Sequence, residues 1–188
     1  MNFAIVGATG NVGRKTIKIL EKSKLKINSL FLVASKRSAG KKISFKRKKI
    51  KIEALENYDF SKAAITFFAA GSIIAKKWAS IAAKQTIVID NSKHFRMDRN
   101  IPLVVPEVNE SALKNYKKTN IIANPNCSTA QLVVALKPLH DKFKIKRVVV
   151  STYQAVSGAG KAPMDELFSQ TKDFLNGKKI KSKNFTKQ

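Results

Sequence analysis

The sequence predicts an α/β fold in which a parallel β-sheet carries helices on both faces. Short apolar runs alternate with segments of helical periodicity over residues 1–90. A glycine-rich segment, GATGNVG, lies between the first apolar run and the first helical segment. Such alternation is typical of parallel sheets whose strands are joined by right-handed helical crossovers. Both observations therefore predict a parallel sheet that is covered by helices.

The first half of the chain supplies the expected strands and helices of this sheet. Residues Asn11–Lys22 and 73–84 have their apolar side chains at helical spacing and are expected to be amphipathic helices. Residues 42–55 carry too many charges for a central strand, so edge strands or a ribbon are expected there. The expected sheet strands are the apolar runs at 3–6, 30–34, 64–69 and 86–89.

The second half of the chain also alternates expected strands with expected helices. An apolar stretch at 101–108 and a short helix at 109–116 precede an expected strand at 120–123 and a turn at 124–126. Apolar residues then recur at helical spacing from Cys127 onward, which predicts a helix that begins close to this cysteine. We further expect a strand at 146–153, a helix at 163–176, and a polar segment without regular structure at 177–188.

Composition excludes several classes of protein. The chain of 188 residues is 44% hydrophobic, and no apolar run is long enough to span a bilayer. Cys127 is the only cysteine, so a disulfide framework or a cysteine-rich metal site is excluded, and no metal is expected. The N-terminus lacks the features of an export signal. These observations predict a cytoplasmic protein.

The net charge of +25 could indicate a nucleic-acid or anionic membrane partner. The basic residues are mostly lysines scattered over nearly every segment, and the cluster at 46–49 has no accompanying aromatic residues. A protein from a lysine-rich proteome would have the same composition. We therefore expect neither a nucleic-acid nor a membrane partner.

The glycine-rich segment has the position of a phosphate-binding loop. Gly7, Gly10 and Gly13 follow the first strand and open the first helix. Glycines there allow a tight turn and a close approach of the backbone to a pyrophosphate, which the helix N-terminus attracts. Glycines also serve turns without any ligand. The position between strand and helix predicts a Rossmann-type domain that binds a dinucleotide.

The segment after the second strand distinguishes NAD from NADP. NAD-binding versions usually place a carboxylate about 20 residues past the glycines, and residues 34–41 contain none. Ser35, Arg37 and Ser38 instead suit a 2′-phosphate, because a guanidinium can form paired charge-assisted bonds with it. The alternative is a solvated basic loop. The rarity of arginine in this chain favours NADP.

Two residues of the central part are candidates for acyl-transfer chemistry. Cys127 lies at a turn that enters a helix, where the helix N-terminus stabilises a thiolate, although a lone cysteine can equally be a buried structural residue. Arg96 follows the fourth strand and could hold a phosphate or carboxylate, or pair with Asp98. His94 lies nearby but is a weak candidate for a base, and His140 is interpreted as structural.

Taken together, the motifs resemble those of the aspartate-semialdehyde dehydrogenase family. They occur in the family's order over nearly all of the chain to about residue 175, and NPNCST followed by QAVSGAG is the specific pair. The matching stretches are GATGNVG, SKRSAGK at 35–41, FFAAG at 67–71, DNSKHFRMD at 90–98, PLVVPEVN at 102–109, NPNCST at 124–129, ALKPLHD at 135–141 and STYQAVSGAGK at 151–161.

The resemblance implies a reaction and a set of roles. The family reduces L-aspartyl 4-phosphate to the semialdehyde with NADPH and releases phosphate, on the route to lysine, methionine and threonine. Cys127 would attack the acyl phosphate, Gln154 would orient the acyl group, and Arg96 with Asn126 would hold the phosphate. The residues implied to contact NADP are Gly7, Thr9, Gly10, Asn11, Val12, Gly13, Ser35, Arg37, Ser38, Ser157 and Gly158.

The resemblance also implies a domain division and a missing part. Residues 1–126 would form the NADP-binding domain, and residues 127–188 the beginning of an α+β catalytic and dimerisation domain. The family's histidine acid/base, a further phosphate-binding residue and the arginine for the substrate carboxylate would lie beyond Gln188. We therefore expect the 188 residues alone to be inactive, and the complete protein to be a homodimer or homotetramer. Lys93 and His94 depart from the smaller residues expected before Phe95.

Three alternatives remain open at this point. The first is another enzyme, N-acetyl-glutamyl-phosphate reductase, which uses the same cofactor, thioester and phosphate chemistry. Glyceraldehyde-phosphate dehydrogenase is more distant, because its usual sequence around the cysteine is not found here. A non-catalytic NADP-binding paralogue is the second alternative, and a basic nucleic-acid-binding protein is the third. The presence of Cys127, Arg96 and Gln154 together favours the catalytic interpretation.

Overall fold

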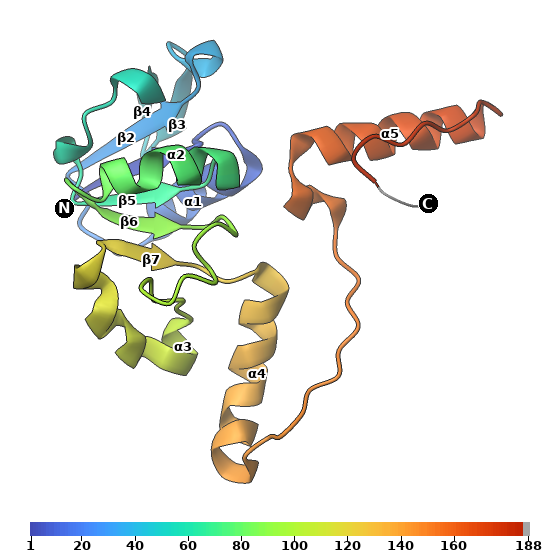
Figure 1. Cartoon of the computed structure of the whole chain (residues 1–188). Coiled ribbons are helices and arrows are strands. Elements are labelled where there is room, and N and C mark those ends of the chain that lie inside the picture. Colours follow the sequence, from blue (N-terminus) through green and yellow to red (C-terminus); the bar gives the residue numbers. More distant parts are fainter. Residues whose placement is uncertain (186–188) are drawn as a thin grey trace. The chain divides into compact units, whose positions relative to one another are not determined.

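A computed structural model describes residues 1–185 of the chain. Its contacts divide the chain into two compact units, Met1–Val148 and Val149–Gln188, and each unit is described by itself. The first unit holds the sheet and its helices, and the second holds the helix α5 (Figure 1). The division falls later than residue 126 because the long helix α4 contacts α3 in the first unit.

The first unit is built on a seven-stranded sheet with the order β3-β4-β2-β1-β5-β6-β7. All neighbouring strands are parallel except β3 and β4, which form an antiparallel hairpin. The expected mostly parallel α/β sheet is therefore confirmed. The strands are β1 (Asn2–Val6), β2 (Ser29–Ala34), β3 (Lys42–Phe45), β4 (Lys48–Ala54), β5 (Ile65–Phe68), β6 (Ile87–Asp90) and β7 (Ile121–Ala123).

The charged segment at 42–55 departs in part from its expected place. β3 is an edge strand as expected, but β4 lies inside the sheet between β3 and β2. Ile50 and Ile52 of β4 pack against the core, whereas Lys49 and Lys51 are exposed on the other face. The two-residue period of a strand thus places Lys49 and Lys51 on the face opposite to Ile50 and Ile52.

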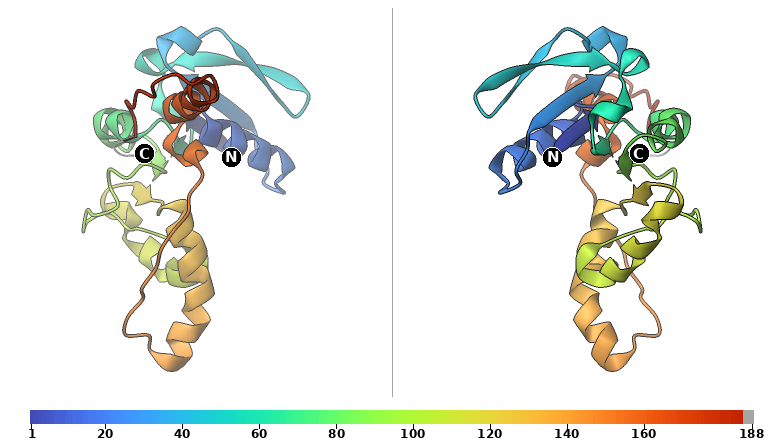
Figure 2. Two further views of the ribbon diagram at one scale, coloured as in Figure 1. Left: turned by 90° about the vertical axis from the view of Figure 1, so that its right-hand side faces the viewer. Right: turned by 90° about the vertical axis from the view of Figure 1, so that its left-hand side faces the viewer.

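Helices cover both faces of the sheet. Alternate residues of β1 face opposite sides, with Phe3 and Ile5 in one core cluster and Ala4 and Val6 in the other. Helix α1 (Asn11–Lys22) packs on the first cluster, and α2 (Ser72–Ala82) packs on the second through small buried alanines. Figure 2 shows these two helices on either side of the strands.

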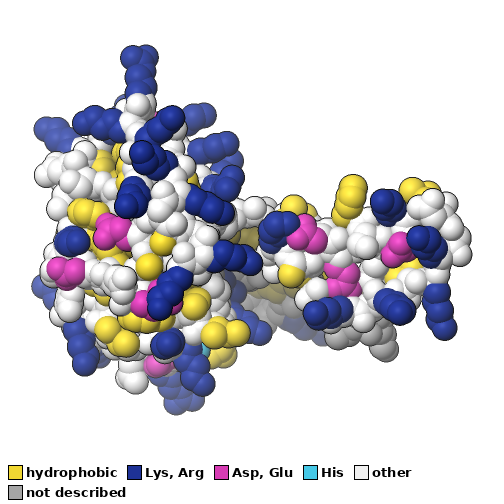
Figure 3. All heavy atoms as spheres, turned by 90° about the horizontal axis from the view of Figure 1, so that it is seen from above, with side chains coloured by type: hydrophobic (Ala, Val, Ile, Leu, Met, Phe, Trp, Pro, Cys, Tyr) yellow, Lys and Arg dark blue, Asp and Glu magenta, His cyan; other side chains and the backbone are white. Residues whose placement is uncertain are grey.

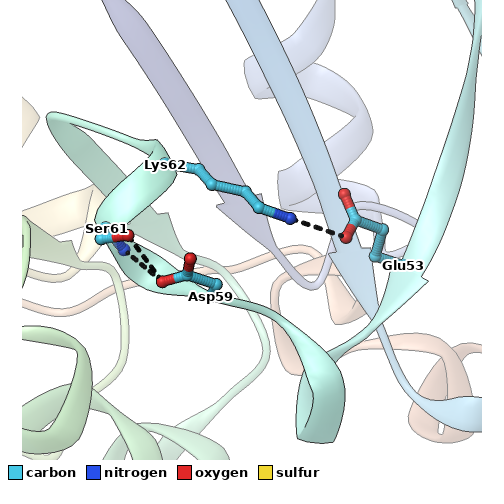
Figure 4. A network of polar contacts seen from close by, with 4 residues as sticks. All are labelled: Glu53, Asp59, Ser61 and Lys62. Atoms are coloured by element: carbon cyan, nitrogen blue, oxygen red, sulfur yellow. Dashed lines mark hydrogen bonds and ion pairs between the residues drawn. The ribbon is translucent and has the colours of Figure 1, made fainter.

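The connection from β4 to β5 is fixed by a small polar network. Asp59 accepts hydrogen bonds from the backbone nitrogen of Ser61 at 3.0 Å and from its hydroxyl at 2.7 Å, and these bonds lower the pKa of Asp59. Lys62 reaches Glu53 on β4 at 3.8 Å (Figure 4). These contacts hold the connection against the sheet, with Tyr58 buried among Phe31 and Phe60.

Helices α3 (Pro106–Asn109) and α4 (Cys127–Phe143) complete the first unit. The expected short helix at 109–116 corresponds to a 3-10 helix over Glu110–Lys118. The expectation that a helix begins close to Cys127 is confirmed, because Cys127 is the first residue of α4.

The expected strand at 146–153 is wrong for this structure. Residues 144–155 contain neither helix nor strand, and Val149 and Tyr153 are largely exposed. A β-strand needs a hydrogen-bonded neighbour, and no strand of the described residues 1–185 pairs with this segment. The β-branched composition alone was therefore insufficient to predict a strand.

The second unit consists of a 3-10 helix over Val156–Ala159 and the helix α5 (Lys161–Leu175). Glu166 of α5 accepts hydrogen bonds from the backbone nitrogens of Lys183 and Asn184, each at 2.7 Å. These bonds lower the pKa of Glu166 and tie the following segment to the helix. The expected polar segment contains no helix or strand over residues 176–185, and residues 186–188 lie outside the described part.

Candidate active site

The expected site residues of the first unit share one edge of the sheet. Strands β1, β2, β5, β6 and β7 are parallel, so their carboxyl ends meet at this edge. The chain builds the sheet outward from β1 in one direction through β2 and then in the other through β5. Ligands of open α/β sheets bind outside the carboxyl ends at such a switch point. The loops that follow these strands therefore define the candidate site.

The glycine loop after β1 leaves no room for side chains at two positions. Gly7 has a φ of +88°, and a Cβ there would lie 2.6 Å from the carbonyl oxygen of Ala69. A Cβ on Gly13 would lie 2.2 Å from the carbonyl oxygen of Gly7. The loop therefore packs its backbone directly against α1 and against the segment after β5.

The N-terminus of α1 has the properties of an anion site. Gly10 is the N-cap residue of α1 and, as a glycine, has no side chain that could cap the first turn. Thr9 is half-buried, and Gly10, Asn11 and Val12 are exposed along this turn. The glycine backbone and the helix dipole together fit the pyrophosphate of a dinucleotide.

The segment after β2 lies beside this loop because β2 pairs with β1. Ser35 precedes a 3-10 helix over Lys36–Ser38, whose turn is closed by a bond of 2.8 Å from Ser38 N to Ser35 O. Ser35 and Arg37 are exposed, and Ser38 is half-buried. These groups can reach a ligand that occupies the edge next to the glycine loop.

Arg96 is held at the ends of two neighbouring strands. Its Nε donates to the carbonyl oxygen of Asn124, after β7, at 2.9 Å. Its Nη2 donates to the carbonyl oxygen of Asn91, after β6, at 3.1 Å. No ion pair to Asp98 is formed among the described residues. Arg96 thus has an anchored, half-buried guanidinium, a group that can form charge-assisted hydrogen bonds with a phosphate.

A buried carboxylate lies at the base of the Arg96 loop. Asp90, the last residue of β6, is fully buried and accepts from Ser92 Oγ at 2.6 Å and from Ser92 N at 3.1 Å. Burial raises the pKa of Asp90, while the Ser92 bonds and the nearby charges of His94 and Arg96 oppose this rise. His94 N in turn donates to Ser92 Oγ at 3.0 Å.

Cys127 is exposed at the first position of α4. Asn126 caps this helix, because its Oδ1 accepts from Ser128 N at 3.0 Å and from Ser128 Oγ at 2.6 Å. The Sγ of Cys127 lies 3.9 Å from the same Oδ1. The thiol is therefore accessible and lies where a helix N-terminus stabilises an anion. The alternative of a buried structural cysteine does not describe this residue.

The remaining expected residues belong to the second unit. Gln154 is exposed, and its Oε1 accepts from Thr152 Oγ1 at 3.3 Å. Ser157 and Gly158 lie in the 3-10 helix that leads into α5, and a Cβ on Gly158 would meet no atom within 4 Å. The expected site residues within 1–148 thus lie in segments at or following the carboxyl ends of neighbouring parallel strands, and these three are described within their own unit.

Sequence reasoning missed the two asparagines that hold Arg96. Asn124 Nδ2 donates to Asn91 Oδ1 at 2.8 Å, which joins the ends of β6 and β7. The available signal was that each asparagine directly follows a strand of the sheet. Their partners could not be inferred, because the strand order was not known from the sequence.

Within residues 1–185, no group of three or more His, Cys, Asp or Glu side chains could hold a metal ion. No helix in the same part of the chain has the length and apolar character needed to cross a membrane. Lysine and arginine side chains occur throughout the face shown in Figure 3, with acidic side chains among them.

Comparison with known protein families identifies both parts of the chain. Residues 2–116 match the model for the semialdehyde dehydrogenase NAD-binding domain. The chain belongs to the semialdehyde dehydrogenase family. Residues 136–188 match the model for the dimerisation domain of the same family. The first match covers the glycine loop, Arg37 and Arg96, which supports a Rossmann-like NAD(P)-binding domain in this family member.

Individual relatives in the semialdehyde dehydrogenase family agree. The chain is 49% identical over 188 residues to aspartate-semialdehyde dehydrogenase 2 of Vibrio cholerae, covering all of this chain and 56% of the relative. It is 53% identical over 179 residues to the Aquifex aeolicus aspartate-semialdehyde dehydrogenase, covering 94% of this chain and 53% of the relative. The chain thus spans about half the length of the curated relatives it matches.

Solved structures give the same family. A crystal structure of the Vibrio cholerae aspartate-semialdehyde dehydrogenase II complexed with ASA superposes with a TM-score of 0.93 at 48% identity, covering 100% of this chain and 56% of that one. The Candida albicans enzyme, solved with NADP, gives a TM-score of 0.65 at 30% identity, covering 76% of this chain and 47% of that one. The fold of this family member is therefore that of structurally characterised aspartate-semialdehyde dehydrogenases.

Proposed function

We propose that this chain carries the NADP-binding part and the nucleophile of an aspartate-semialdehyde dehydrogenase. The complete protein would reduce L-aspartyl 4-phosphate to L-aspartate 4-semialdehyde and release phosphate, in the biosynthesis of lysine, methionine and threonine. The observation that carries the proposal is the position of Cys127. It is an exposed thiol at the N-terminus of α4, on the sheet edge that also holds the glycine loop and the anchored Arg96.

Cys127 and Arg96 would perform the acyl-transfer step. The thiolate would attack the acyl carbon, forming a carbon–sulfur bond while the bond from carbon to the phosphate oxygen breaks. Arg96 would hold the phosphate as it leaves, with guanidinium N–H groups that the Asn91 and Asn124 carbonyls do not occupy. Gln154 would orient the acyl group and Asn126 would contribute to the phosphate site.

The cofactor proposal rests on the two loops after β1 and β2. The glycine-capped N-terminus of α1 fits the pyrophosphate, and Ser35, Arg37 and Ser38 fit a 2′-phosphate beside it. We propose that Ser157 and Gly158 complete this site. Bound NADPH would supply the hydride that reduces the thioester on Cys127. The chain itself would contribute binding, orientation and the thiol that is regenerated.

The proposal extends to domain organisation and assembly. Residues 1–126 would act as the cofactor domain and residues 127–188 as the beginning of the catalytic and dimerisation domain. The match of 136–188 to a dimerisation domain supports a homodimer or homotetramer of the complete protein. We propose that residues 1–188 alone turn over no substrate, because the acid/base histidine and the carboxylate-binding arginine of the family would have to come from further residues.

The proposal is tested with a chimera. This chain covers 56% of the Vibrio cholerae relative. Residues 1–188 are joined to the C-terminal part of that relative that the chain does not cover. We expect phosphate-dependent oxidation of L-aspartate 4-semialdehyde with NADP⁺, and its loss in Cys127→Ser. Residues 1–188 alone are the matched control and should be inactive.

Each other outcome of this test has a definite meaning. A preference for N-acetyl-glutamate 5-semialdehyde would identify the reductase of that acyl phosphate instead. A folded chimera that binds NADP⁺ without turnover of either semialdehyde would favour the non-catalytic paralogue. Turnover by residues 1–188 alone would contradict the proposal that further residues are needed.

A further inference from the structure

The guanidinium of Arg96 is fixed by the carbonyl oxygens of two residues that directly follow different strands of the sheet. Asn91 O lies at the end of β6 and accepts from Nη2 at 3.1 Å, and Asn124 O lies at the end of β7 and accepts from Nε at 2.9 Å. A guanidinium has five N–H donors in a rigid plane, so these two bonds determine where its remaining donors lie. Any change in the spacing of the two carbonyls would turn or release the guanidinium.

The side chains of the same two asparagines set that spacing. Asn124 Nδ2 donates to Asn91 Oδ1 at 2.8 Å, across the gap between the two loops. Asn91 is itself tied to β5, because its backbone nitrogen donates to the carbonyl oxygen of Phe68 at 3.0 Å and its Nδ2 does so at 3.3 Å. Asn124 N donates to Asp90 O at 2.8 Å. The three strand ends are thus linked through the two amides.

Asn124 also begins the turn that places the nucleophile. Pro125 and Asn126 follow it directly, and Asn126 caps the helix whose first residue is Cys127. Asn124 therefore accepts a hydrogen bond from Arg96 and also begins the turn that leads to Cys127. The Asn91–Asn124 bond connects the loop that carries the phosphate arginine with the loop that carries the thiol.

We propose that Asn91 and Asn124 are positioning residues for phosphate binding. They form a clamp, defined here as the Asn124 Nδ2–Asn91 Oδ1 bond together with the two carbonyls that hold Arg96. The clamp keeps the remaining N–H groups of Arg96 at a fixed place relative to Cys127, and it touches no substrate itself. The inference rests on the proposed role of Arg96 in holding the substrate phosphate.

The alternative explanation is that the two amides only stabilise the fold. A purely structural bond would change the unfolding temperature when removed but would leave the affinity for an anion unaltered. Asn109 offers a matched control, because its side chain makes two comparable bonds, accepting from Val105 N at 2.8 Å and donating to Leu103 O at 2.9 Å, without contacting Arg96. The two explanations therefore differ in what Asn124→Ala and Asn109→Ala do to phosphate binding.

The test uses the 188-residue chain with inorganic phosphate as the probe. The rate at which iodoacetamide alkylates Cys127 is measured against phosphate concentration, and the unfolding temperature is measured in parallel. We expect phosphate to protect the thiol of the parent chain. Asn124→Ala and Asn91→Ala should each raise the half-protecting phosphate concentration about fivefold, the effect of one lost hydrogen bond. The double variant should be little worse than either single variant, because both remove the same bond.

Arg96→Gln separates the failure of the clamp from the failure of the proposed function. The clamp is overturned and the role of Arg96 stands if phosphate no longer protects Cys127 in Arg96→Gln but protects it in Asn124→Ala at the same concentration as in the parent. The role of Arg96 is overturned, and the clamp with it, if phosphate protects Cys127 in Arg96→Gln as well as in the parent, or if it does not protect Cys127 in the parent. Asn109→Ala should lower the unfolding temperature and leave the half-protecting concentration unchanged. A shift of that concentration equal to the shift in Asn124→Ala would overturn the clamp, because the loss of a comparable bond away from Arg96 would then weaken phosphate binding equally.

Discussion

The carbonyl oxygen of Gly7 lies 2.2 Å from the position that a Cβ on Gly13 would occupy. Gly7 directly follows the first strand and Gly13 lies in the first turn of α1, so the loop and the helix touch backbone to backbone. The glycine spacing that predicts a dinucleotide loop from the sequence is therefore also a packing requirement. The loop can keep its shape only while both positions lack a side chain.

Gly13→Ala is expected to destabilise the first unit strongly. The added methyl group would meet backbone atoms that cannot rotate away, so the loop or α1 must move, at an expected cost of about 3 kcal/mol in the free energy of unfolding. Gly10→Ala is the matched control, since its Cβ would lie 3.4 Å from the carbonyl oxygen of Gly7, an ordinary van der Waals distance. Urea denaturation of the two variants measures the difference. Equal stability of both variants would contradict the packing argument.

Arg37→Ala is expected to reduce the preference for NADP⁺ over NAD⁺. Arg37 is exposed after β2, beside two serines and without a carboxylate in the segment 34–41. Losing one charge-assisted contact to a 2′-phosphate should weaken NADP⁺ binding about tenfold or more, while NAD⁺ binding changes little. Titration calorimetry with both nucleotides measures this ratio. Arg47→Ala, an exposed arginine of the β3–β4 hairpin, should leave the ratio unaltered.

Much of the sheet could be predicted from the sequence because its signals are local. The apolar runs, the glycine loop and the helical spacing of Asn11–Lys22 depend on neighbouring residues, and α1 has the bounds that were expected. The start of α4 at Cys127 was predictable for the same reason, from apolar spacing and a preceding turn.

The features that were not predictable depend on partners distant in sequence. The interior place of β4 follows from its pairing with β2, and the strand expected at 146–153 is absent because no described strand lies beside it. The Asn91–Asn124 bond joins residues 33 positions apart and requires β6 and β7 to be neighbours. Residue types identified Arg96 and Cys127 as candidates, but only the strand order shows what holds them.

The carboxyl group of Asp90 is expected to titrate at higher pH than an ordinary aspartate. Burial raises its pKa and the Ser92 bonds oppose the rise, so Ser92→Ala should raise the pKa of Asp90 further. Because the folded-state pKa lies above the unfolded-state value, this group's contribution to stability is present below the unfolded pKa and is lost as pH rises through the folded pKa. Carbon-13 NMR of the Asp90 carboxyl measures both midpoints. A lower midpoint in Ser92→Ala than in the parent would contradict the assignment of causes.

Substitutions of Asn126 are expected to separate helix capping from phosphate binding. Asn126 Oδ1 accepts the bonds that begin α4, and Ala cannot replace them, so Asn126→Ala should lower the free energy of unfolding by about 1 kcal/mol. Asn126→Asp keeps an oxygen acceptor at the cap and should retain most of this stability. Its negative charge, next to Cys127, should nevertheless weaken phosphate binding if Asn126 borders the phosphate site. Urea denaturation and phosphate protection of Cys127 measure the two effects independently. An Asn126→Asp variant with the stability and the phosphate affinity of the parent would show that Asn126 does not border the phosphate. Arg96 would then be the anion-binding side chain of the loops that follow β6 and β7.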